Sequence, residues 1–113
     1  MKTTNAEKPV FQGDLMVIRV NELPKNAVEV KDNVVAHSET GHHHVVERAR
    51  VFRVLGDTMR SYLRPRGDDG IDLIHLRPFD THETLRLLDD GDPIYEVRRQ
   101  REWVPEGMRA VRD

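Results

Sequence analysis

Short apolar runs separated by turn residues follow one another along most of the chain. Within these runs apolar and polar positions tend to alternate, and β-branched residues are frequent, which is typical of half-buried strands. The pattern predicts strands over residues 14–20, 27–30, 34–39, 43–55, 58–63, 71–76 and 94–104. The turn residues at 31–33, KDN, predict that two of these strands form a hairpin.

One segment, THETLRLLDDG at 81–91, fits two structures. Thr81 and Thr84 resemble a helix cap and Gly91 a helix stop, while the leucines fit neither period uniquely. We favour a strand because the neighbouring segments are strands. The sequence therefore predicts an all-β fold, either a small antiparallel barrel or a jelly-roll sandwich.

Length and punctuation indicate one domain. A chain of 113 residues suits a single hydrophobic core, and its Gly and Pro residues are scattered as turn residues. We expect a flexible leader over residues 1–9, a single β domain over residues 10–105, and a C-terminal tail or short helical turn over residues 106–113.

Charge and composition exclude several classes of function. The chain has 18 basic and 20 acidic residues, whereas general nucleic-acid binding usually needs a basic surface. No apolar stretch is long enough to span a membrane, and the N-terminus lacks the apolar core of a signal peptide. Cysteine is absent, which excludes thiolate metal sites and a cysteine nucleophile. We expect a cytoplasmic protein, or a virion-associated one if a phage encodes it.

Three of the six histidines are consecutive, in the stretch SETGHHHVV. On a strand, His42 and His44 point to the same side and His43 to the other, so the first two can converge on one ion. Imidazole nitrogen binds zinc, iron, nickel, copper and manganese. The spacing therefore predicts a divalent transition-metal site. The alternative is that the histidines are solvated or hydrogen-bonded and bind no metal.

Two histidines make an incomplete site, and His82 is the best candidate for a third ligand. His75 and His37 share strand parity with apolar residues, so we expect both to face the core. Glu39, in the loop before the cluster, and Glu47, after it, are candidate carboxylate ligands, although Glu47 has the wrong parity unless a bulge intervenes.

The last predicted strand carries candidate partners for these histidines. Gln100 and Glu102 share one face of it and could hold imidazole tautomers by hydrogen bonds. The alternative is a solvated edge strand with cross-strand ion pairs.

The GHHH stretch resembles the first motif of the cupin superfamily, in which an HxH pair on a strand precedes a glutamate and a later histidine completes the metal site. His42 and His44 match the pair, and His82 could match the later histidine. Glu47 comes earlier than the cupin glutamate. This resemblance implies a cupin-like sandwich with a divalent metal.

A broader resemblance is to small uncharacterised proteins of bacteria and their phages. The matching text is FQGDLMVIRVNELP, SETGHHH, THE and GDPIYEVRRQREWVPEGMRAVRD, which covers most of the chain. It implies no activity, but it groups the GHHH, THE and QREW segments as features of one molecule.

Two functions follow from these observations. The first is a metal-dependent, cupin-like protein, either an enzyme or a binder of a small ligand supported by the metal. The second is a non-enzymatic interaction module, such as a phage or virion-associated accessory protein that forms a homo-oligomer or a larger assembly, in which the histidines are structural.

Overall fold

The regular structure of the described residues is entirely β-strand, as predicted. The structure, a computed structural model, describes residues 1–37, 43–76, 83–104 and 107–110, with side chains as far as residue 100 except at 36, 37 and 76. The strands are β1 (Lys2–Thr4), β2 (Val10–Gln12), β3 (Leu15–Val20), β4 (Ala27–Val30), β5 (Val34–His37), β6 (His43–Glu47), β7 (Ala49–Val54), β8 (Arg60–Pro65), β9 (Ile71–Leu76), β10 (Leu85–Leu87), β11 (Ile94–Arg99), β12 (Arg101–Val104) and β13 (Gly107–Ala110). These residues contain no helix that could span a lipid bilayer.

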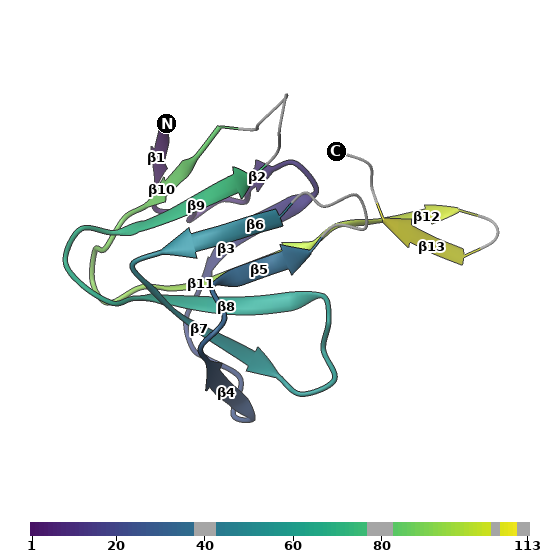
Figure 1. The fold of residues 1–113 in the computed structure, drawn as a ribbon, viewed down its shortest axis with the longest axis horizontal. Coiled ribbons are helices and arrows are strands. Elements are labelled where there is room, and N and C mark those ends of the chain that lie inside the picture. Colours follow the sequence, from purple (N-terminus) through teal and green to yellow (C-terminus); the bar gives the residue numbers. More distant parts are fainter. Residues whose placement is uncertain (38–42, 77–82, 105–106, 111–113) are drawn as a thin grey trace.

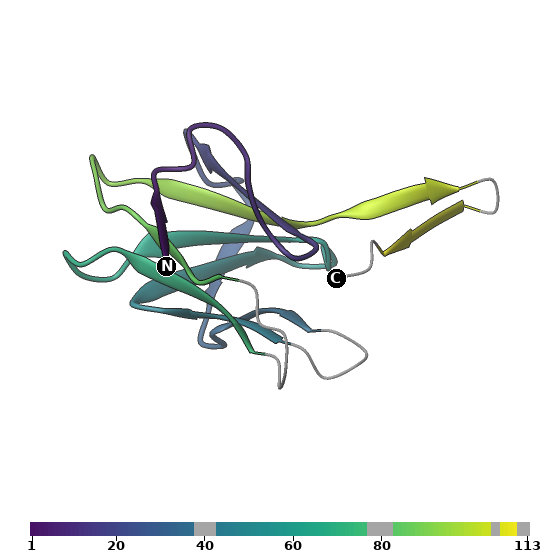
Figure 2. The ribbon, with the colours of Figure 1, turned by 90° about the horizontal axis from the view of Figure 1, so that it is seen from above.

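Eleven of the strands form two sheets that pack as a sandwich (Figures 1 and 2). The first sheet has the order β1-β10-β9-β6-β5, and the second has the order β2-β3-β11-β8-β7-β4. Neighbouring strands run antiparallel except for the parallel pair of β1 and β10. Of the two predicted architectures, the described strands therefore adopt the sandwich. The segment 81–91 contains strand β10, as we predicted.

The chain passes from the first sheet to the second at Arg48. The sequence predicts one extended segment over 43–55, but β6 lies in the first sheet and β7 in the second. Arg48, between them, has φ 62°, a left-handed conformation that breaks the strand. The hairpin predicted at 31–33 is wrong, because the chain changes sheet there as well. β4 pairs with β7 in the second sheet, whereas β5 pairs with β6 in the first.

Side chains from both sheets meet in one buried apolar cluster. Strand alternation places every second residue inward, as with Leu15 and Val17 on β3 and Ile71 and Leu73 on β9. Burying such apolar surface contributes about 25 cal/mol per Å² to folding. The cluster contains Ala6, Leu15, Val17, Val35, Val46, Val51, Leu63, Ile71, Leu73, Leu85, Leu87, Tyr95 and Val97.

Both ends of the chain contribute strands. β1 lies within the expected leader, where it pairs with β10, and Ala6 is buried in the core. β13 lies within the expected C-terminal tail and pairs with β12, so the strand predicted over 94–104 is divided at Gln100. The hairpin of β12 and β13 projects beyond the sandwich (Figures 1 and 2).

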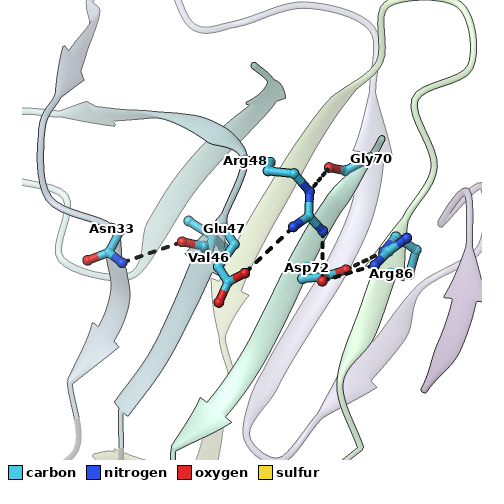
Figure 3. Close-up of polar contacts among 7 residues, drawn as sticks. All are labelled: Asn33, Val46, Glu47, Arg48, Gly70, Asp72 and Arg86. Carbon is cyan, nitrogen blue, oxygen red and sulfur yellow. Dashed lines mark hydrogen bonds and ion pairs between the residues drawn. The ribbon is translucent and has the colours of Figure 1, made fainter. Parts of the chain in front are cut away.

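An ion-pair network on the first sheet holds the segment at which the chain changes sheet (Figure 3). Asp72 accepts hydrogen bonds from Arg86, and its carboxylate lies 2.7 Å from a terminal nitrogen of Arg48. The Arg48 Nε also donates to the carbonyl of Gly70 at 3.3 Å. The pKa of Asp72 is lowered below its ordinary value. The hydrogen bond from Arg86 is the largest cause, and the contact with Arg48 lowers the pKa further.

Gly70 tests how tightly this turn packs. It has φ +81°, and a Cβ added there would lie 2.6 Å from the backbone oxygen of Leu87. We expect Gly70→Ala to lower the free energy of unfolding by about 2–4 kcal/mol, because backbone strain and a steric clash act together. Urea denaturation measures this change.

Gly56→Ala is the matched control. Gly56 also has a positive φ, of +88°, but an added Cβ would meet no atom within 4 Å. We expect Gly56→Ala to lower the free energy of unfolding by about 1 kcal/mol, from backbone strain alone. Equal losses at the two glycines would contradict the close approach of Gly70 to β10.

Asp72→Asn tests the ion-pair network. The pKa of Asp72 is lowered in the fold, so its stabilisation is present above the unfolded pKa and is lost as pH falls through the folded pKa. We expect the free energy of unfolding of the variant to be about 1–2 kcal/mol lower than that of wild type at pH 7. This difference should become smaller in acid, where Asp72 of the wild type is protonated. Thermal unfolding from pH 7 to pH 2 measures both effects.

The control is Glu29→Gln. Glu29 pairs with Arg50 in the same way, but this pair is exposed, so the change in stability should be much smaller. An Asp72→Asn deficit that stays constant with pH would contradict a role for the charged carboxylate.

Candidate functional site

Two buried histidines face the core from adjacent strands of the first sheet. His44 on β6 and His75 on β9 are direct partners in the register of the sheet, and each is 2% exposed. They share the inward face with Val46 and Leu73, which belong to the apolar core. The expectation that His75 faces the core is confirmed. Their rings are stacked, with centroids 4.1 Å apart and planes within 6° of parallel.

Gln12 accepts a hydrogen bond from one nitrogen of the His44 ring. This side chain, at the end of β2 in the second sheet, is 1% exposed. Its Nε2 donates to the carbonyls of Leu73 at 2.8 Å and Glu83 at 2.9 Å. The amide therefore presents its oxygen, Oε1, to His44 Nδ1 at 2.9 Å, and an acceptor there requires Nδ1 to carry a proton.

Asp14 lies at the other ring nitrogen of His44. Its Oδ1 is 3.5 Å from His44 Nε2, and its side chain is 12% exposed. When Nδ1 holds the only ring proton, Nε2 carries the lone pair that can bind a cation. Two ligands of one tetrahedral ion, each at about 2.0–2.2 Å, lie about 3.4 Å from each other. The spacing therefore suits either an ion held by both groups or an ion pair with a doubly protonated ring.

The residue that follows β11 in the second sheet also contacts Asp14. The backbone N–H of Gln100, directly after β11, donates to the carbonyl of Asp14 at 2.8 Å. The backbone of Gln100 thus lies beside Asp14, which contacts His44. The predicted hydrogen bond from the Gln100 side chain to a histidine stays a prediction. The side chain of Glu102, the other residue expected to support the histidines, lies outside the described part of the chain.

Of the other predicted ligands, only Glu47 belongs to the described part of the chain. His42, His82 and Glu39 lie outside the described residues. Glu47 is on the outer side of β6 from His44, where its carboxylate lies 3.6 Å from Arg48 (Figure 3). Within the described part of the chain, no group of three or more histidine, aspartate or glutamate side chains is arranged to hold a metal.

Sequence reasoning overlooked Gln12 and Asp14. Both belong to the FQGD segment, whose pattern in the sequence does not by itself indicate a ligand or a partner for histidine. The available signal was Gly13 between them, which has φ 58° and turns the chain so that both polar side chains reach His44. His44, their common partner, is 32 residues from Gln12 in the sequence, so only the packing of the sheets shows the contact.

Comparison with protein families places this core in a known group. A family model described as "Domain of unknown function (DUF8820)" matches residues 11–100. The chain belongs to the DUF8820 family. The region matched by DUF8820 includes Gln12, Asp14, His44 and His75 and ends at Gln100. No curated protein and no solved structure matches the chain.

Replacing Gln12 tests the buried network. Gln12→Met removes the donors to Leu73 and Glu83 and the acceptor at His44, and it leaves buried carbonyls without that partner. We expect a loss of about 2–4 kcal/mol in the free energy of unfolding. Nitrogen-15 NMR of the ring should show Nδ1–H in wild type and a shift of the His44 tautomer in the variant.

Asn33→Ala is the control, because Asn33 also donates to a strand carbonyl, that of Val46, but over 3.5 Å and from an exposed position (Figure 3). The free energy of unfolding of Asn33→Ala should differ little from that of wild type. A His44 tautomer that is the same in wild type and in Gln12→Met would show that Gln12 does not set it.

Proposed function

We propose that this small β domain binds a divalent transition metal at His44 and Asp14. The observation that carries the proposal is the approach of Asp14 Oδ1 to His44 Nε2, at 3.5 Å, while Gln12 engages the opposite nitrogen. Histidines that bind metals almost always donate their second N–H to an oxygen acceptor, which fixes the tautomer and orients the ring. The bond from His44 Nδ1 to Gln12 has this form.

His42 and His82 are the proposed additional ligands. In sequence, His42 directly precedes His43, the first residue of β6, and His44 follows it. His82 directly precedes Glu83, whose carbonyl accepts a hydrogen bond from Gln12. The described neighbours of both residues therefore lie close to the His44 and Asp14 pair.

The donor atoms limit which metals the proposed site would bind. Imidazole nitrogen and carboxylate oxygen suit zinc, iron, nickel or manganese, and the chain has no cysteine to favour a softer ion. An ion held by these groups could bind a small ligand with an oxygen donor, or polarise it as a Lewis acid. The domain would then be a metal-supported binder or a metal-dependent enzyme.

Metal binding is tested on the full chain after treatment with a chelator and dialysis. Calorimetry with Zn²⁺, Mn²⁺, Ni²⁺ and Fe²⁺, followed by elemental analysis, should find one ion per chain. We expect His44→Gln and Asp14→Asn each to weaken binding at least about 10-fold. Binding should also weaken from pH 7.5 to pH 5, because a protonated imidazole nitrogen cannot bind metal.

Glu47→Gln is the control, because Glu47 is a carboxylate three residues from His44 on the opposite face of the strand, and it should leave affinity unchanged. Circular dichroism establishes that each variant is folded. The proposal fails if the wild type takes up no stoichiometric metal, or if Asp14→Asn binds as tightly as wild type.

The buried stack of His44 and His75 favours a second candidate, in which the histidines are structural and the domain is an interaction module. Under this alternative the variants lose stability without any change in metal content. Native mass spectrometry of the same samples would then be expected to show a homo-oligomer or a larger assembly.

A further inference from the structure

We infer that His75 is a positioning residue for the metal ligand His44 and is not itself a ligand. This inference rests on the proposed function. The two residues are opposite each other on β6 and β9, and their rings stack at 4.1 Å with planes only 6° apart.

The parallel stack prevents the two rings from sharing an ion. An imidazole nitrogen binds a metal through a lone pair that lies in the plane of the ring. In two parallel stacked rings these lone pairs lie in separate parallel planes and do not converge. An ion between the planes would be far out of plane for both nitrogens, so an ion bound at His44 Nε2 could not also be bound by His75.

The stack instead limits how the His44 ring can rotate. Gln12 holds Nδ1 from one side, at 2.9 Å, and a hydrogen bond of this kind allows the ring to tilt about it. The flat face of His75 lies against the His44 ring, so a tilt would force the two rings together. Together the two contacts keep Nε2 directed toward Asp14, and ligand geometry held in advance strengthens binding.

The burial of His75 makes this restraint firm. His75 is 2% exposed, as is His44, so both rings are enclosed by the close-packed interior. Truncating His75 would leave a cavity beside the His44 ring, into which that ring could turn. A flat aromatic replacement would preserve the restraint, whereas a small side chain would remove it.

The experiment compares His75→Phe with His75→Ala in the full chain, using Zn²⁺ calorimetry at pH 7.5. We expect His75→Ala to weaken Zn²⁺ binding about 10- to 100-fold, and His75→Phe to stay within about 3-fold of wild type. Rescue by a ring that cannot bind metal separates positioning from ligation. Equal affinity in wild type and a folded His75→Ala variant overturns the inference, as does loss of binding in a folded His75→Phe variant.

A measurement on the wild type keeps the test decisive if a variant does not fold. With ¹¹³Cd²⁺ as the probe and nitrogen-15-labelled histidine, coupling between cadmium and nitrogen should appear at His44 Nε2 and be absent at both nitrogens of His75. Coupling at His75 overturns the inference while leaving the metal site intact. Absence of any bound metal in wild type overturns the proposed function as well.

Discussion

The buried amide of Gln12 links the two sheets and orients the ring of His44, which faces the core between them. It belongs to a strand of the second sheet, yet it donates to Leu73 in the first sheet and to Glu83 beside it. Both amide hydrogens are committed to these carbonyls, so the amide oxygen must face His44. A buried polar network of this kind specifies one arrangement of its members, because each alternative leaves a group unsatisfied.

The path of the chain places the residues of this network together. The left-handed turn at Arg48 ends β6 in the first sheet and starts β7 in the second. Asp72 holds Arg48 and Arg86 on the outer side of the first sheet, where β6, β9 and β10 are adjacent. The pairing of β6 with β9 then brings His44 and His75 face to face on the inner side.

Strand alternation made part of the site predictable. The parity of His75 with Ile71 and Leu73 correctly indicated a core-facing ring. The HxH spacing predicted His44 as a metal ligand, and this role stays a prediction. Gln12 and Asp14 were not predictable in the same way, since their partners are distant in sequence and β2 is too short to show a clear pattern. Glu47 illustrates the reverse case, because its parity already argued against the inward face on which His44 lies.

The sequence by itself determined that this protein is built of strands, because alternating apolar positions can bury a face only in extended structure. It also determined the available chemistry, which is imidazole, carboxylate and amide without thiol. Only the tertiary structure decided which of these groups meet. Strand pairing and sheet packing are non-local, so the Arg48 turn, the split of β4 from β5, and the contacts among Gln12, Asp14, His44 and His75 arise from the assembled sandwich rather than from any one segment.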